Sequence, residues 1–382
     1  MLIGLDARLW GTAHGGIGRY IAELIVHLLK IDRNNQYVFF VYNDFDRRAI
    51  VENLRERLPR DLKRTFEFVL APYRWYSLNE QLFMASVIKK ARVDLMHFPH
   101  FNVPILYNGR YIVSVHDLII HHFPDERATT LPPWLYQLKL MGYKKVLHHA
   151  ITGARQIITP SRFTKEDLLN YYKIDSKKVS VIYEGVNQLN QKIRNKKLEI
   201  KNYLLYVGSA YPHKNLEKLI EALKILRTKN NQTNLDLVIA GKIDFFANRL
   251  QKQIGVNFPE LLPHIKFFGV ADDDELALLY QNAALYVFPS LYEGFGLPPL
   301  EAMSFGLPVV AAEATSIPEI CEDAAIYFDP NDATDMADKI NQVLIDQKLQ
   351  ADLREKGLAL IKKYSWEQMA QETLEVYQTK RK

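Results

Sequence analysis

The chain has 382 residues, a mass of 44.3 kDa, 48% hydrophobic and 24% charged residues, and a formal net charge of +5. This length exceeds one hydrophobic core and predicts two or three domains, while the composition excludes a disordered chain. The single cysteine, Cys321, excludes an internal disulfide and favours a reducing compartment. The first residues do not form a signal peptide, and no apolar run approaches the roughly 20 residues that span a bilayer, so we expect a cytoplasmic protein.

Continuous apolar runs, rich in β-branched and aromatic residues, recur along the whole chain. Their ranges are 37–42, 93–98, 111–117, 156–161, 179–185, 203–209, 235–242, 265–270, 284–290 and 308–312. Runs of this kind are typical of parallel strands that are buried on both faces. Helical patterns lie between them, for example after GGIGRY (15–20) and after the capping box formed by Asp272 and Glu275. The alternation predicts α/β domains with parallel sheets and helices on both faces.

The most polar and least patterned stretch lies near the middle of the chain. We interpret residues 187–201 as a linker between two α/β domains, at 1–186 and 202–365, and residues 366–382 as a final helix. Two doubly wound domains leave a cleft at the carboxyl ends of their strands, where ligands of this fold class bind.

Seven lysines and arginines lie between residues 46 and 64. The basic segment 47–64 is therefore a candidate for peripheral contact with anionic lipid at the inner face of the membrane. The interleaved Asp and Glu residues are also typical of an ordinary solvated helix face, which is the simpler interpretation. Because no zinc-finger, RNP or basic-zipper pattern accompanies the charge, we expect no nucleic-acid partner.

The segment YEGFGLPPLE (292–301) predicts a strand end, a glycine turn and a short helix with prolines in its first turn. The first amides of a helix have no partner within it, and glycines let an anion approach the main chain. We therefore expect the N–H groups of Phe295, Gly296 and Leu297 to face an anion such as a diphosphate.

Glu293 and Glu301 flank this uncharged segment. Burial of the two carboxylates requires compensation, and the vicinal hydroxyls of a sugar or ribose would donate suitable hydrogen bonds. In the alternative interpretation, Glu301 only favours the helix N-terminus electrostatically and Glu293 is solvated.

Several motifs along the chain, in this order, resemble those of retaining glycosyltransferases of the GT-B fold, family 4, and in particular bacterial mannosyltransferase-like members. They are GGIGRY (15–20), VHDL (115–118), TPSRFTKEDL (159–168), VIYEGV (181–186), YVGSAYPHKNL (206–216), VIAGK (238–242) and YEGFGLPPLEAMSFGLPVVAA (292–312). The resemblance covers nearly the whole chain. It implies two Rossmann-like, doubly wound parallel-sheet domains that face each other across a cleft, with the final helix packed on the N-terminal domain.

The resemblance also assigns roles to single residues. It implies that Glu301 holds the ribose hydroxyls, that Glu293 contacts the donor sugar and that Lys214 neutralises the diphosphate. This chain has His213 where many relatives have an arginine, and it has Ser209 and Ala210 where some relatives carry another arginine. The phosphate clamp is therefore expected to depend mainly on Lys214 and the loop amides.

Further donor contacts follow from the resemblance. Gly16 and Gly18 in the first loop are expected to contact the diphosphate; a Rossmann G-x-G-x-x-G fingerprint, the competing interpretation, would need glycine where Ile21 stands. The complete donor-binding set is Gly16, Gly18, Ser209, His213, Lys214, Lys242, Val270, Glu293, Gly294, Phe295, Gly296, Leu297 and Glu301.

The candidate catalytic residues are His116, Glu293 and Lys214. His116 ends a predicted strand, and its equivalent in the family lies beside the donor sugar, where it could stabilise charge or orient the acceptor. The other histidines have no spacing typical of a metal site. The triplet DFD (44–46) resembles the D-x-D motif that holds a divalent cation in the other large glycosyltransferase fold, but Asp residues after a strand are more typical of a turn, so we expect no metal.

The resemblance implies retaining transfer of a hexosyl group, with mannose favoured, from a nucleotide-diphosphate sugar to a glycan or lipid-linked acceptor in polysaccharide biosynthesis. GDP-mannose is the favoured donor, and no cofactor is expected. Two alternatives remain open: a nucleotide-sugar 2-epimerase on the same fold, which would need no acceptor, and a non-catalytic sugar-binding protein.

Overall fold

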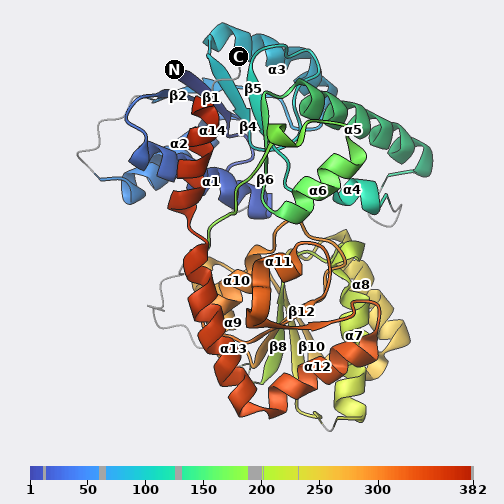
Figure 1. Ribbon diagram of the computed structural model, residues 1–382. Coiled ribbons are helices and arrows are strands. Elements are labelled where there is room, and N and C mark those ends of the chain that lie inside the picture. The colour runs from blue at the N-terminus through green and yellow to red at the C-terminus, as the bar shows by residue number, and fades with distance from the viewer. Residues whose placement is uncertain are drawn as a thin grey trace. The chain divides into compact units, whose positions relative to one another are not determined.

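The computed structural model describes residues 1–11, 14–59, 66–124, 131–187, 200, 202–230 and 232–379. The chain divides into two compact units (Figure 1). Unit 1 consists of residues 1–118, 131–185 and 365–382, and unit 2 of residues 119–130 and 186–364.

Unit 1 contains a seven-stranded sheet in the order β3-β2-β1-β4-β5-β6-β7. All neighbouring strands pair in parallel. The strands are β1 (Leu2–Asp6), β2 (Gln36–Val41), β3 (Phe66–Leu70), β4 (Leu95–Phe98), β5 (Tyr111–Ser114), β6 (Gln156–Thr159) and β7 (Val179–Val181). Because every parallel connection crosses over through the next layer, the helices cover both faces of the sheet.

The helices of unit 1 include one that comes from the far end of the chain. They are α1 (Gly15–Ile31), α2 (Asp44–Arg57), α3 (Leu78–Ala91), α5 (Pro133–Gly153), α6 (Arg162–Tyr171) and α14 (Trp366–Gln378). The C-terminal helix α14 packs against α1, as Figure 1 shows. The predicted return of the last helix to the N-terminal domain is thereby confirmed.

Unit 2 contains a six-stranded sheet in the order β10-β9-β8-β11-β12-β13, again all parallel. Its strands are β8 (Tyr203–Val207), β9 (Asp236–Ala240), β10 (Ile265–Gly269), β11 (Leu285–Phe288), β12 (Val309–Ala312) and β13 (Ala325–Phe328). Its helices are α4 (Ile119–His122), α7 (Leu216–Thr228), α8 (Phe245–Asn257), α9 (Asp273–Asn282), α10 (Leu297–Ser304), α11 (Ile317–Cys321), α12 (Ala333–Ile345) and α13 (Gln347–Leu360).

The predicted α/β class with two doubly wound parallel sheets is confirmed, as is the capping box of Asp272 and Glu275 at the start of α9. Three strands were not predicted: β1, β3 and β13. Strand β3 is only partly buried, and Glu67 interrupts its apolar residues. Strand β13 is a continuous run of four apolar residues, so no break in the pattern explains why it was not predicted. Strand β1 is buried but short, and Gly4 interrupts its apolar residues.

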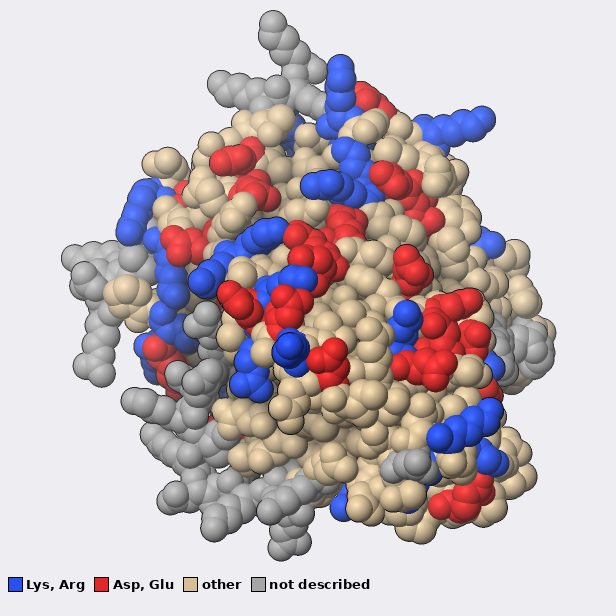
Figure 2. All heavy atoms as spheres, turned by 60° about the horizontal axis from the view of Figure 1, so that its bottom comes forward, with Lys and Arg blue, Asp and Glu red and all other residues tan. Residues whose placement is uncertain are grey.

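The basic segment 47–64 lies mainly on α2, and its residues 60–64 fall outside the described part of the chain. The guanidinium of Arg57 forms two hydrogen bonds, of 3.0 and 2.6 Å, with the buried carboxylate of Glu23 on α1, so Arg57 anchors α2 to the core. Asp44 and Asp46, part of the DFD triplet, lie in the first turn of α2, where the Asn43 side chain caps the helix. On the face shown in Figure 2, basic and acidic side chains are interleaved.

Candidate active site

The loop between β11 and α10 forms the centre of the site in unit 2. Its Gly296 adopts φ +117°, a conformation that disfavours any other residue, and it directly precedes α10, which starts with Leu297 and has Pro298 and Pro299 in its first turn. Among the described residues, no side-chain oxygen caps α10. Pro298 and Pro299 carry no N–H, so Leu297 is the only one of the first three residues of α10 that can donate a backbone hydrogen bond. Contact of an anion with the N–H groups of Phe295, Gly296 and Leu297 stays a prediction.

Two hydroxyl residues after β12 hold this loop in place. The N–H of Glu293 donates to Oγ1 of Thr315 (3.0 Å). The hydroxyl of Ser316 donates to the carbonyls of both Glu293 (2.9 Å) and Phe295 (3.0 Å). Thr315 itself adopts φ +53°, a rare conformation for a β-branched residue. Sequence analysis did not find these two residues; the only indication was a hydroxyl pair directly after a predicted strand.

Lys214 and Glu293 form a close ion pair. Their side-chain atoms Nζ and Oε1 lie 2.6 Å apart, and the two side chains are only 17% and 12% exposed. Lys214 ends a 3₁₀ turn (Pro212–Lys214), after which Asn215 adopts φ +60°. The Asn215 amide donates to the carbonyls of Pro289 (3.1 Å) and Pro330 (2.8 Å), and so fixes the lysine turn to the segments that follow β11 and β13.

Glu301 lies on α10 and is 5% exposed. The hydroxyl of Tyr280 on α9 donates a hydrogen bond of 3.1 Å to its Oε2, and the Tyr280 ring stacks on Phe305 (5.4 Å between centroids). Neither acid of the YEGFGLPPLE segment is turned outward, so the interpretation of Glu293 as a solvated side chain does not describe this structure.

The remaining predicted donor contacts of unit 2 lie at the carboxyl ends of β8, β9 and β10. Gly208, Gly241 and Gly269 meet there: the N–H of Gly241 donates to the Gly269 carbonyl (2.9 Å), and a Cβ on Gly241 would lie 2.0 Å from the Gly208 oxygen. Each of these glycines directly precedes a predicted donor contact, and those contacts are Ser209, Lys242 and Val270. Lys242 and Val270 are exposed, and the carbonyl of Ser209 accepts a hydrogen bond from the Tyr206 hydroxyl.

His213 is buried beside Lys214. Burial, together with the positive charge of Lys214, lowers the pKa of His213 to about 3, so its imidazole is neutral at physiological pH. His213 therefore does not replace the positive charge of the arginine that many relatives have there.

Gly16 and Gly18 lie in the first turn of α1 in unit 1. Gly16 is exposed, whereas a Cβ on Gly18 would lie 1.9 Å from the Gly11 carbonyl oxygen. Close packing against the chain therefore already requires glycine at position 18, and a diphosphate contact by either glycine stays a prediction.

His116 follows β5 in unit 1, and both of its ring nitrogens have protein partners. Nδ1 lies 3.1 Å from Oε1 of Glu184, and Nε2 lies 2.9 Å from the carbonyl oxygen of Pro99. Both partners are acceptors, so both ring nitrogens must donate, and this geometry requires the charged imidazolium. Burial alone would lower the pKa of His116, but Glu184, the Pro99 carbonyl and Asp117 outweigh it and raise the pKa above its ordinary value.

This raised pKa predicts a defined pH dependence of stability. The His116–Glu184 pair should stabilise the fold fully below the unfolded-state pKa of about 6.5, and this stabilisation should be lost as the pH rises through the higher folded-state pKa. We expect the difference in melting temperature between the wild type and Glu184→Gln to be largest near pH 6 and to shrink at alkaline pH. A difference that is constant or grows with pH would contradict the charged pair.

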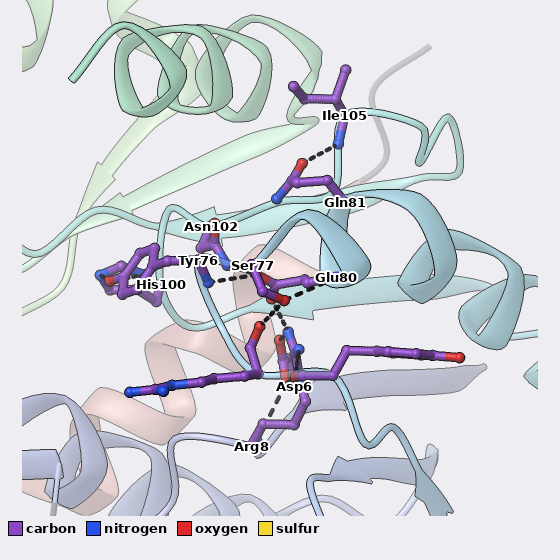
Figure 3. A network of polar contacts seen from close by, with 11 residues as sticks. Asp6, Arg8, Tyr76, Ser77, Glu80, Gln81, His100, Asn102 and Ile105 are labelled. Atoms are coloured by element: carbon purple, nitrogen blue, oxygen red, sulfur yellow. Dashed lines mark hydrogen bonds and ion pairs between the residues drawn. The ribbon is translucent and has the colours of Figure 1, made fainter. Parts of the chain in front are cut away.

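Figure 3 shows a buried polar network around Glu80 in the same unit. The Arg8 guanidinium contacts Asp6 (2.6 Å) and Glu80 (2.6 Å) and donates to the Tyr73 carbonyl (2.9 Å). Glu80 also accepts hydrogen bonds from the Tyr76 N–H (2.8 Å) and from the side chain of Asn102. Sequence analysis did not predict this network, because its members come from distant parts of the chain.

In the described ranges, no group of three or more His, Cys, Asp or Glu side chains is arranged to hold a metal ion. The metal-free site nevertheless stays a prediction.

Comparisons with known proteins bear on the family. Residues 14–188 match the model of Glycosyltransferase Family 4, and residues 187–359 match that of Glycosyl transferases group 1. The chain belongs to the family 4 glycosyltransferases. It is 27% identical to the O-antigen chain mannosyltransferase B of Escherichia coli over 95% of both chains. It is 28% identical to the O-antigen chain mannosyltransferase RfbU of Salmonella typhimurium, over 69% of this chain and 68% of the relative.

A solved structure shows the same fold. The crystal structure of Anabaena Alr3699/HepE in complex with UDP and glucose superposes with a TM-score of 0.72, at 17% identity and over 99% of both chains. The resemblance to bacterial mannosyltransferase-like members of the family, which the motifs predict, is confirmed by the relatives, and the GT-B fold is confirmed by this structure.

Proposed function

We propose that the protein transfers a hexosyl group, with mannose favoured, from a nucleotide-diphosphate sugar to a glycan or lipid-linked acceptor in polysaccharide biosynthesis. The observation that carries the proposal is the Lys214–Glu293 pair at 2.6 Å beside the uncapped start of α10. A cation, a carboxylate and the start of a helix without a side-chain cap, all in one largely buried place, match the diphosphate and hydroxyl groups of a sugar nucleotide. The O-antigen mannosyltransferases among the relatives support mannose.

In the proposed reaction the bond between the sugar C1 and the diphosphate breaks, and negative charge develops on the leaving group. Lys214 and the N–H groups of Phe295, Gly296 and Leu297 stabilise this charge. Glu293 accepts hydrogen bonds from the sugar hydroxyls, and Glu301, oriented by Tyr280, accepts them from the ribose. We further propose that the transfer retains the anomeric configuration and needs no metal or cofactor, with the departing phosphate accepting the proton of the acceptor hydroxyl.

Membrane contact belongs to the same proposal. No helix in the described ranges is both long and apolar enough to cross a bilayer. We propose a cytoplasmic protein that reaches a lipid-linked acceptor from the inner face of the membrane, with exposed arginines of the segment 47–64, such as Arg48 and Arg55, contacting anionic lipid.

A thermal-shift screen against GDP-, UDP- and ADP-sugars tests the donor, because a ligand that binds the native state raises the melting temperature. We expect GDP-mannose to give the largest shift. Incubation of the best donor with and without a mannoside acceptor then separates the activities. A lengthened glycan supports the transferase, a new nucleotide sugar without acceptor would indicate the 2-epimerase, and binding without turnover would indicate a sugar-binding protein.

A further inference from the structure

Tyr76 in unit 1 combines exposure with a strained backbone. It is 50% exposed and adopts φ +60°, which is costly for an aromatic residue and persists only where the surroundings enforce it. Its N–H donates to Oε2 of Glu80 (2.8 Å), and its hydroxyl lies 3.1 Å from Nε2 of His100. The residue is therefore held at its backbone N–H and at its hydroxyl group, while half of its surface is exposed to solvent.

The anchor that enforces this conformation is itself rigid. Glu80 is fully buried and paired with Arg8, whose guanidinium also binds Asp6 and the Tyr73 carbonyl (Figure 3). Arg8 thus fixes the start of the loop 73–77, and Glu80 fixes its end. Burial of the charged side chains of Arg8 and Glu80 is costly, and its effect is to hold Tyr76 in a strained conformation with half of its surface exposed. Stability of the fold alone does not account for this arrangement.

Tyr76 is linked to the candidate catalytic histidine through residues 99 and 100. His100, the partner of the Tyr76 hydroxyl, directly follows Pro99, whose carbonyl binds Nε2 of His116. The neighbouring Trp75 ring packs edge-on against His14, 4.8 Å away, directly before the glycine turn that starts α1. All these residues follow the carboxyl ends of strands, where ligands of doubly wound sheets bind.

We propose that Tyr76 is a stacking platform for a pyranose ring of the acceptor glycan. This inference rests on the proposed function, since it names the acceptor subsite of that reaction. A pyranose presents an apolar face of C–H groups, and a preorganised aromatic ring can bury this face without losing conformational freedom of its own. Because Tyr76 is linked to His116 through residues 99 and 100, a sugar stacked on its ring would lie near the candidate catalytic histidine.

Two variants and one control test the platform. Tyr76→Gly removes the ring and relieves the positive φ, so folding should persist, and Tyr76→Phe keeps the ring without the hydroxyl. Phe83→Ala is the matched control, because Phe83 is also 50% exposed and lies on α3 of the same unit. The probes are methyl glycosides and disaccharides of mannose, glucose, galactose and N-acetylglucosamine. Their binding without donor is measured by saturation-transfer NMR, and melting temperatures verify the fold.

We expect the mannosides to bind the wild type, Tyr76→Gly to lose about tenfold or more in affinity, and Tyr76→Phe and Phe83→Ala to stay within about threefold. Unchanged binding by Tyr76→Gly, or a wild type that binds none of these saccharides, would overturn the platform. Transfer assays distinguish the two hypotheses. If the wild type transfers sugar and Tyr76→Gly keeps its acceptor KM, only the platform fails. If the wild type transfers nothing while saccharide binding still depends on Tyr76, only the proposed function fails.

Discussion

Replacement of Lys214 by alanine is expected to lower the kcat of sugar transfer by about 100-fold or more, because a preorganised cation beside a leaving group acts mainly on the transition state. Nζ of Lys214 is held 2.6 Å from Glu293 at a site with little solvent exposure, so water cannot readily take its place. Removal of the lysine also leaves Glu293 without its counter-charge, which opposes the entry of an anionic donor. Steady-state kinetics with the donor found by thermal shift measure the effect.

The matched control is Lys218→Ala, one turn further along the chain on α7. Lys218 pairs with Glu221, and its side chain is 36% exposed, so its loss should leave kcat unchanged. The double variant Lys214→Ala/Glu293→Ala adds a second test. If the pair acts as a unit, the double variant should be little slower than either single variant. A Lys214→Ala enzyme with a kcat within threefold of the wild type would remove Lys214 from the mechanism.

The largest loss of stability is expected for Glu80→Ala. This change leaves Arg8, with a side chain only 2% exposed, paired with Asp6 alone, and it removes the acceptor for both the Tyr76 N–H and the Asn102 amide. A buried charge pair that loses one partner typically costs about 3–5 kcal/mol, which corresponds to a fall in melting temperature on the order of 10 °C. Chemical and thermal unfolding measure the loss.

Glu80→Gln keeps the side-chain length and one acceptor oxygen, so it should be less destabilising than alanine. The surface control is Glu260→Ala, which removes only an exposed ion pair with Lys224 and should leave the melting temperature unchanged. Equal melting temperatures for Glu80→Ala and Glu260→Ala would show that the Arg8 network does not stabilise unit 1.

The central strands and the glutamate loop could be predicted because their information is local. Buried parallel strands appear as continuous apolar runs, and Glu293 and Glu301 lie within one ten-residue segment. Strand β3 could not be found this way, since Glu67 interrupts its apolar residues. The four apolar residues of β13 do form a continuous run, so this reason does not apply to it.

The partners of the candidate site residues could not be predicted from the sequence. Lys214 and Glu293 are separated by 79 positions, His116 and Glu184 by 68, and Arg8 and Glu80 by 72. Such pairs meet only when crossover connections bring the carboxyl ends of strands to one edge of a sheet. Glu184 illustrates this limit: it stands in the motif VIYEGV (181–186), yet nothing in that motif indicates a histidine as its partner.

The position of α14 has a consequence for how the protein is synthesised. Tyr377 is 2% exposed, and its hydroxyl contacts Nδ1 of the buried His97 on β4 at 2.7 Å. The helix that completes the core of unit 1 is therefore translated after the whole of unit 2. The N-terminal half cannot complete its packing until α14 has been synthesised. A premature stop before α14 would damage the half of the molecule that is encoded first.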